Sequence, residues 1–210
     1  PLDVSFGAVI TDIRIADMDE AEWLVVEDAF HEHAALVFPD QHLSEEEQIA
    51  FGERFGDIEL LRPDPSKKAV PISNLKEDGL PYAPEEGRFK TLRGNEGWHT
   101  DSSYMPLAAK ASILAAIKVP YTGGETELAD MRDAFDKLDA EMVDRIDGLS
   151  AYHSLYQSQK KNGFSFKTGD GYGYHNKGAP LRPLIKVHPM TGRKSLFIGR
   201  HAYKIPGMPG

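Results

Sequence analysis

Trp98-His99-Thr100-Asp101 is the stretch of this chain that decides its interpretation. Side chains on an extended segment repeat at every second position, so His99 and Asp101 are expected to point the same way. A neutral imidazole beside a carboxylate supplies two ligands of the two-His-one-carboxylate facial triad, which holds non-haem Fe(II) and leaves open positions for other ligands. The pair alone is a weak pattern, and its weight comes from the sequence around it.

The segments on either side of this pair differ in character. Residues 62–97 are rich in Pro, Gly, Lys and Glu with little periodicity. Because a loop longer than about 15 residues in a compact domain is usually functional or disordered, this segment is predicted to be a mobile lid. Downstream, the apolar run Ala111–Val119 and the run Glu125–Ala129 are predicted strands, separated by the turn Thr122-Gly123-Gly124.

The rest of the chain combines helical and strand patterns. Ser44 and Glu47 form the signature of a capping box, which begins a helix that extends to about Phe55. The other predicted helices are 19–33, 131–138 and 140–146. The predicted strands are 4–15, 34–38, 149–155, 184–188 and 195–198, and the last two are joined as a hairpin by the turn 189–192.

Composition limits the classes of function. The chain has 210 residues, with 24 Lys and Arg against 33 Asp and Glu, and a net charge of −9. This balance argues against nucleic acid or an anionic membrane as the main partner, but it allows a local basic pocket for a small anion. The sequence contains no cysteine, so a metal would be held by nitrogen and oxygen ligands. The absence of an apolar run near the roughly 20 residues that span a bilayer, and of a signal pattern, predicts a cytoplasmic protein.

Two blocks carry a resemblance to a known family. They are Asn95-Glu96-Gly97-Trp98-His99-Thr100-Asp101-Ser102-Ser103-Tyr104 and Pro120-Tyr121-Thr122-Gly123-Gly124-Glu125-Thr126-Glu127-Leu128-Ala129-Asp130-Met131. With the hairpin sequence His188-Pro189-Met190-Thr191-Gly192-Arg193 and two N-terminal segments, 34–39 and 51–56, they resemble the taurine / 2,4-dichlorophenoxyacetate dioxygenase family of Fe(II)- and 2-oxoglutarate-dependent oxygenases. The resemblance extends over nearly the whole chain.

The resemblance implies a fold and a site. The fold would be mainly β with flanking helices, a double-stranded β-helix of the jelly-roll kind, formed by one oxygenase domain over residues 1–210. His99 and Asp101 would bind iron, while Thr126 and Asn95 would contact 2-oxoglutarate. The substrate side would be formed by His188, His201, Lys90, Arg93 and Ser102.

The chain also departs from the family pattern. The family's third ligand lies in a Trp-Asp-Asn-x-x-x-x-His motif, followed by the arginine that pairs with 2-oxoglutarate, and these 210 residues contain no such motif. The chain begins at Pro1 without Met and ends in the loop-like run 205–210. We therefore expect the domain to be incomplete at its C-terminal end, with the third His ligand beyond Gly210.

The implied reaction is the hydroxylation of a small organic acid, aryloxyalkanoate-like or sulfonate-like, next to a heteroatom. It would consume O₂ and 2-oxoglutarate, give succinate and CO₂, and use ascorbate as a reductant. Because the protein is acidic, at least one of Lys90, Arg93, Arg200 and His201 is expected to pair with the substrate anion. The expected partners are this small anionic molecule and further copies of the chain in a homo-oligomer, with no nucleic acid and no membrane.

Two alternatives stay open at this point. One is a hydroxylase of the same fold that acts on an amino acid or a natural product. The other is a non-catalytic jelly-roll binding protein. The intact residues His99, Asp101 and Thr126 argue against the second alternative.

Overall fold

The computed structural model describes residues 1–60, 66, 68–161, 163–169 and 171–208. The described chain divides into two compact units, each formed by segments that are distant in the sequence. The first unit comprises 1–58, 111–147 and 185–196, and the second comprises 59–110, 148–184 and 197–210. None of the helices in the described ranges is long and apolar enough to cross a membrane.

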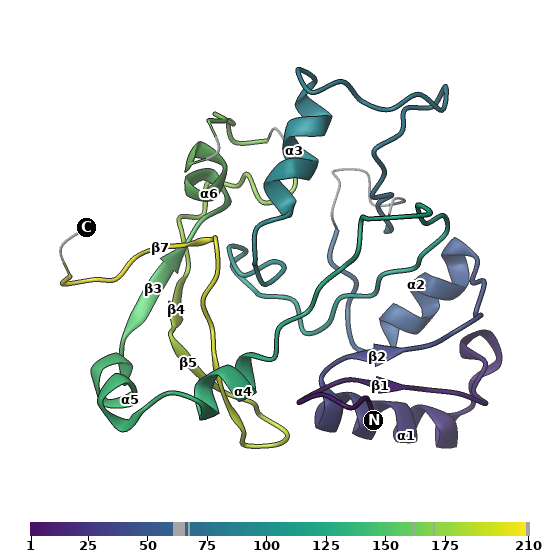
Figure 1. Ribbon diagram of the computed structural model, residues 1–210, viewed down its shortest axis with the longest axis horizontal. Coiled ribbons are helices and arrows are strands. Elements are labelled where there is room, and N and C mark those ends of the chain that lie inside the picture. The colour runs from purple at the N-terminus through teal and green to yellow at the C-terminus, as the bar shows by residue number, and fades with distance from the viewer. Residues whose placement is uncertain (61–65, 67, 162, 170, 209–210) are drawn as a thin grey trace. The chain divides into compact units, whose positions relative to one another are not determined.

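The N-terminal part of the first unit is a short parallel strand pair with two helices. The strands are β1, Ala8–Val9, and β2, Leu36–Val37, and the helices are α1, Glu20–His33, and α2, Glu45–Glu53 (Figure 1). A 3₁₀ turn, Ile15–Asp17, precedes α1. The predicted strand 4–15 is thus reduced to two residues, while both N-terminal helices form where their patterns predict them.

Both N-terminal helices begin with a capping box. The Asp19 side chain accepts a hydrogen bond from the backbone of Glu22, whose carboxylate accepts one from the backbone of Asp19. Ser44 and Glu47 form the same reciprocal pair at the start of α2, as predicted. Each box satisfies backbone donors that a helix start would otherwise leave unpaired.

The core of the first unit is aromatic. Trp23 and Val26 of α1 pack with Phe51 of α2, and partly buried apolar residues surround them. The Trp23 and Phe55 rings meet edge to face with centroids 4.9 Å apart. Such contacts add stability beyond the burial of apolar area and fix the two helices against each other.

The remaining elements of the first unit are two short helices and a hairpin. They are α4, Met131–Asp136, α5, Ala140–Ile146, β5, Ile185–Val187, and β6, Lys194–Leu196. The strands pair antiparallel with Ile185 opposite Leu196, and the backbone N–H of His188 donates to Arg193 O, which confirms the predicted hairpin. α4 packs against β6.

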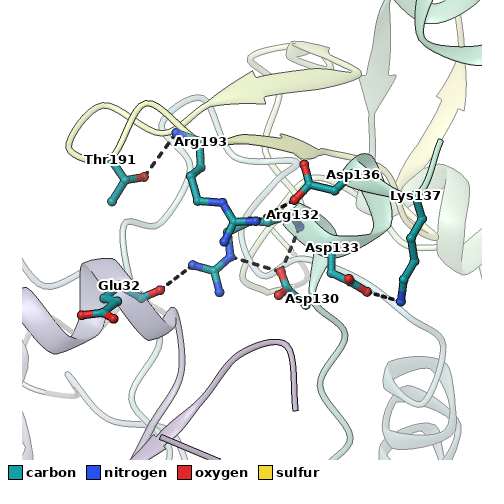
Figure 2. A network of polar contacts seen from close by, with 8 residues as sticks. All are labelled: Glu32, Asp130, Arg132, Asp133, Asp136, Lys137, Thr191 and Arg193. Atoms are coloured by element: carbon teal, nitrogen blue, oxygen red, sulfur yellow. Dashed lines mark hydrogen bonds and ion pairs between the residues drawn. The ribbon is translucent and has the colours of Figure 1, made fainter. Parts of the chain in front are cut away.

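A polar network supports this packing. Arg132, at the start of α4, donates to the Asp130 carboxylate (3.1 Å) and to the backbone oxygen of Glu32 at the end of α1 (2.7 Å). Arg193, on the hairpin, donates to Asp136 of α4 at 2.8 Å (Figure 2). Arg132, whose side chain is 11% exposed, therefore has partners for its charge, because the end of α1 and the residue that caps α4 both supply oxygens to it.

The second unit contains a three-stranded antiparallel sheet with β3 between β4 and β7 (Figure 1). The strands are β3, Ser150–His153, β4, Leu181–Pro183, and β7, Ala202–Lys204. Two helices complete the unit: α3, Gly87–Asn95, and α6, Leu155–Lys161. The C-terminal end of the predicted strand 149–155 is therefore helical.

Three sequence predictions differ from the structure. Residues 111–119 and 125–129 form no strand, and their apolar side chains include Ile117 at 95% exposure. A strand is stabilised by pairing with a neighbouring strand, and the sheets of the described residues include neither segment; Ile113 O instead accepts a hydrogen bond from the Gln48 side chain at 3.3 Å. The predicted lid 62–97 is not aperiodic throughout, because α3 begins at Gly87; its positions 62–65 and 67 lie outside the described residues. Helical residues outnumber strand residues here, so the described sheets are smaller than a mainly β fold implies.

Candidate metal centre and anion pocket

His99 and Asp101, both in the second unit, meet as their spacing predicts. His99 Nε2 lies 3.2 Å from Asp101 Oδ1. On the other side of the ring, His99 Nδ1 lies 2.7 Å from the backbone oxygen of Gly97. A carbonyl oxygen can only accept, so Nδ1 carries a proton and donates it. When the ring is neutral, its lone pair is therefore on Nε2, which faces the carboxylate.

This arrangement fits two ligands of a metal ion. Bonds of about 2.1 Å at a right angle place neighbouring ligand atoms about 3 Å apart, close to the separation of Nε2 and Oδ1. The contact of Nδ1 with Gly97 is the kind of outer hydrogen bond that orients a metal-binding imidazole. Without a metal, the hydrogen bond to Asp101 raises the pKa of His99 against the opposing effect of burial. Within the described residues, no group of three or more His, Cys, Asp or Glu could hold a metal ion.

Close backbone packing holds the segment that carries this pair. The backbone N–H of Arg200 donates to Trp98 O at 2.9 Å. At Gly199 a Cβ atom would come within 3.2 Å of the His99 Cα, so a larger residue would push the two segments apart. The position of His99 therefore depends on Gly199, which is distant in sequence.

Ser102 lies directly after the pair and is engaged inside the protein. Its backbone has a left-handed φ of 54°, which is uncommon for a serine. Ser102 Oγ donates to Glu59 Oε2 at 2.8 Å, and Tyr172 OH lies 2.5 Å from Ser102 Oγ. Burial raises the pKa of Tyr172, so its phenol stays protonated. Because Ser102 donates its one proton to Glu59, the Tyr172 hydroxyl is the donor in its contact with Ser102 Oγ.

His201 is buried beside the pair. Its ring centroid lies 4.7 Å from that of Tyr104 and 5.6 Å from that of His99. Its Nδ1 lies 2.9 Å from Ser158 Oγ. Burial, with a smaller contribution from the Arg200 charge, lowers the pKa of His201 to about 3, so the ring is neutral at pH 7.

A basic pocket opens next to this segment. Its volume is about 270 Å³, and its lining includes Arg93, Lys161 and Arg200 together with Gly94 and Gly97. Both terminal nitrogens of Arg200 are buried and have no hydrogen-bond partner within the described chain. Burial lowers the pKa of this guanidinium, which means that its charge has lost water without gaining a counter-ion there.

A second unpaired group lies close to Gly94, which lines this pocket. Gln159 of α6 is 1% exposed, and its Oε1 has no hydrogen-bond partner among the residues that the structure describes. A Cβ atom at Gly94 would come within 2.8 Å of this oxygen and 3.5 Å of Arg200 Nη2, so the glycine leaves room there. Buried polar groups in proteins are nearly always paired, so two groups near Gly94 that lack a partner within the described chain, one of them lining the pocket, indicate a ligand site.

The other predicted site residues of the second unit differ in their relation to the pocket, since Arg93 lines it and Lys90 and Asn95 do not. Arg93 is exposed and pairs with Glu96 at 2.7 Å. The Lys90 ammonium lies 5.9 Å above the Phe164 ring and is not part of the pocket lining. Asn95 is exposed at the last position of α3.

Thr126 and His188 belong to the first unit. Thr126 is exposed. His188 Nδ1 accepts hydrogen bonds from the backbone N–H groups of Met190 and Thr191, each at 3.3 Å, and its ring centroid lies 5.6 Å from that of His31. Burial lowers the pKa of His188, and nearby His31 adds to this. His188 thus stabilises the hairpin turn, and the roles predicted for both residues stay predictions.

Sequence reasoning did not identify several residues of the site. Glu59, Ser158, Gln159 and Lys161 were not singled out, and Arg200 was considered for its charge alone. Ser158 and Gln159 lie in the polar run Tyr156–Lys161, where nothing local indicates that both are buried. The signal that reveals them is long-range packing against residues 94 and 201.

A family model and several relatives match this chain. The model described as "Taurine catabolism dioxygenase TauD, TfdA family" matches residues 1–210. The (S)-phenoxypropionate/alpha-ketoglutarate-dioxygenase of Sphingobium herbicidovorans is 49% identical over 214 residues, covering 99% of this chain and 72% of the relative. The alpha-ketoglutarate-dependent 2,4-dichlorophenoxyacetate dioxygenase of Cupriavidus pinatubonensis is 35% identical, covering 100% of this chain and 75% of the relative.

Solved structures agree with the sequence matches. The crystal structure of AAD-2 in complex with Mn(II) and N-oxalylglycine superimposes with a TM-score of 0.84 at 34% identity. The match covers 99% of this chain and 74% of that one.

Proposed function

Because the chain belongs to the taurine catabolism dioxygenase TauD, TfdA family, we propose that it is a 2-oxoglutarate-dependent dioxygenase that hydroxylates a small aryloxyalkanoate-like acid next to its ether oxygen. Relatives at 49% and 35% identity are named for phenoxypropionate and for 2,4-dichlorophenoxyacetate. The single observation that carries the choice of an acid is the buried, unpaired head group of Arg200 beside the His99–Asp101 segment.

His99 and Asp101 are the residues that would hold Fe(II). Bound Fe(II) would supply the activation of O₂ that is coupled to the conversion of 2-oxoglutarate to succinate and CO₂. The chain's own contribution is orientation: Gly97 O holds the His99 ring with Nε2 free of a proton, next to the Asp101 carboxylate. Asn95 and Thr126 are proposed contacts of 2-oxoglutarate. A third histidine ligand and an arginine partner for 2-oxoglutarate stay predictions for sequence outside these 210 residues.

Arg200 is proposed to bind the substrate's acid group. A guanidinium with two free N–H donors matches the two oxygens of a carboxylate or sulfonate, and hydrogen bonds between charged groups are about twice as strong as neutral ones. Lys161 and Arg93 at the same pocket would draw an anion into a protein of net charge −9. The Arg200 backbone is bonded to Trp98, so an acid held there lies next to the segment of the metal ligands.

A substrate panel tests this proposal. The full-length natural enzyme is assayed for 2-oxoglutarate-dependent succinate formation, with ascorbate as reductant, on both enantiomers of phenoxypropionate, on phenoxyacetate, on alkyl sulfonates and on the matching neutral amides. We expect kcat/KM for the acids to exceed that for the amides at least tenfold. Equal turnover of acids and amides would refute the anionic substrate and favour a natural-product hydroxylase. Succinate formation with none of them would favour the binding-protein alternative.

Further properties follow from the same family membership as proposals. The complete fold is a double-stranded β-helix with flanking helices, of which the small antiparallel sheets are parts. The enzyme works in the cytoplasm and forms a homo-oligomer. Ser102, His188 and His201 line the substrate side, and hydroxylation next to the ether oxygen gives a product that releases a phenol.

A further inference from the structure

Ser158 contacts the buried ring of His201 from α6. Ser158 is 3% exposed and His201 is 4% exposed, so water does not compete for their polar atoms. Ser158 Oγ lies 2.9 Å from Leu155 O and 2.9 Å from His201 Nδ1. The backbone of His201 is held as well, because Ser154 N donates to His201 O at 2.8 Å.

These two contacts determine where the protons are. A serine hydroxyl has one proton, and the Leu155 carbonyl can only accept, so Ser158 donates to Leu155 O. If the hydroxyl instead donated to His201, two oxygen lone pairs would face each other at 2.9 Å. The contact with the ring must therefore run from His201 Nδ1–H to Ser158 Oγ. In the neutral ring, Nε2 is then left with its lone pair.

We propose that Ser158 is a positioning residue that holds His201 in the Nδ1–H tautomer, so that Nε2 is offered as a hydrogen-bond acceptor to the ligand bound beside His99. The His201 ring lies next to the rings of His99 and Tyr104. Among the hydrogen bonds of the described residues, none engages Nε2. The functional half of this inference rests on the proposed function, because it needs a ligand at that position.

With this tautomer, His201 and Arg200 prefer different groups of a ligand. An acceptor at His201 Nε2 repels a carboxylate, whereas the guanidinium of Arg200, the next residue in the chain, attracts one. The acid group of a substrate is thus directed to Arg200, and a group with an O–H or N–H is favoured at His201. Without Ser158, the proton of Nδ1 would be buried with no partner. The ring would then shift toward the Nε2–H form, which could bind the acid group in the wrong place.

Nitrogen NMR of the imidazole rings tests the tautomer directly. The two nitrogens of a neutral ring give well-separated protonated and unprotonated resonances, which are recorded for the ligand-free, metal-free protein. We expect a protonated Nδ1 at His201 in the wild type and in Ser158→Thr, and a shift toward protonated Nε2 in Ser158→Ala. Ser154→Ala is the matched control, because Ser154 caps the same helix through Gln157 N but has no side-chain contact with His201. A protonated Nε2 in the wild type, or an unchanged tautomer in Ser158→Ala, would overturn the proposal whatever the substrate is.

Steady-state kinetics test whether the His201 tautomer orients the bound ligand. We expect Ser158→Ala to lower kcat by about two- to tenfold, the effect of one net hydrogen bond, with KM for the acid changed less than twofold and with Ser158→Thr restoring kcat. A Ser158→Ala protein with a changed tautomer but wild-type kcat would overturn the role in orientation. A merely structural role would lower the melting temperature in Ser158→Ala and Ser154→Ala alike, without the tautomer change. Failure of the acid panel alone would count against the proposed function, since the NMR result needs no substrate.

Discussion

Replacement of Arg200 by methionine separates the binding role of its guanidinium from its packing. Methionine keeps an unbranched apolar stem but lacks the charge. The stem of Arg200 packs beside Gly97, where a Cβ atom, if one were present, would lie 3.4 Å from Arg200 Cδ. A charge-assisted hydrogen bond contributes about 1.5–3 kcal/mol. Since about 1.4 kcal/mol is a factor of ten, KM for an acid substrate should rise about 10- to 150-fold. The kcat value should fall less, because Arg200 binds the acid group in the ground state as well as in the transition state.

The same substitution should stabilise the ligand-free protein. The two terminal nitrogens of Arg200 are buried without partners in the described part of the chain, and a buried unpaired donor costs about 1–3 kcal/mol. For a protein of this size, 1 kcal/mol changes the melting temperature by about 2–4 °C. Arg200→Met should therefore raise the melting temperature by about 2–12 °C while it weakens binding of the acid. Such opposite effects are typical of a residue kept for function at the expense of stability.

The assay compares three variants on one acid and its neutral amide. Arg93→Met removes an exposed cation of the same pocket that already pairs with Glu96, and it should change KM less than fivefold. Lys90→Met removes a cation outside the pocket lining and should leave KM unchanged. The amide should be insensitive to all three. An unchanged KM for the acid in Arg200→Met, or a lower melting temperature, would refute the reasoning, because it would mean that the guanidinium has a structural partner.

Three further predictions concern the rest of the protein. His99→Ala should weaken Mn(II) or Fe(II) binding at least tenfold by calorimetric titration, whereas His42→Ala, an exposed control, should not; equal affinities would exclude His99 as a ligand. Burial raises the pKa of Asp130, but the hydrogen bonds from Arg132 outweigh it and leave the pKa below its usual value. This stabilisation is present above the unfolded pKa of about 3.9 and is lost as the pH falls through the lower folded value. The stability advantage over Asp130→Asn in urea melts should thus be constant from pH 7 to about 5 and shrink below about 4, and a constant gap at pH 3 would contradict it. Amides of residues 68–86 should exchange with deuterium faster than those of α1, because they lie outside regular helices; equal protection would contradict a lid.

Local sequence patterns predicted the elements whose causes are local. The capping box at Ser44 and the hairpin after His188 depend on residues a few positions apart, and both form. The box at Asp19, which was not predicted, is equally local. The run 111–119 has the composition of a buried strand, yet Leu114 is 64% exposed. A strand is stabilised by pairing with another segment, and the composition of one run does not specify its partner. α3 was missed for the opposite reason, because its sequence has no clear apolar stripe.

The site residues also divide into those that local sequence predicts and those that only long-range packing brings in. His99 and Asp101 are two residues apart, so their approach followed from the sequence alone. Arg200 and Gln159 reach the site through packing against residues 94 to 98, which are distant in the chain. Ser158 reaches it through His201, 43 positions away. Their burial, and the lack of partners for Arg200 and Gln159, come from this packing and could not be derived from local patterns.

The contrast between Arg132 and Arg200 shows why a buried polar group without a partner in the described chain is informative. Both arginines have side chains that are at least partly buried, and the fold of the first unit gives Arg132 an aspartate and a helix-end carbonyl. A fold can therefore supply oxygens to a buried guanidinium where only stability is at stake. Beside Arg200 lie Gly94 and Gly97, where an added Cβ atom would come within 3.5 Å and 3.4 Å of its side chain, and these glycines contribute space instead of side-chain oxygens. A desolvated cation with glycines beside it, next to the pair proposed to hold the metal, fits the proposed binding of an acid that arrives from outside the protein.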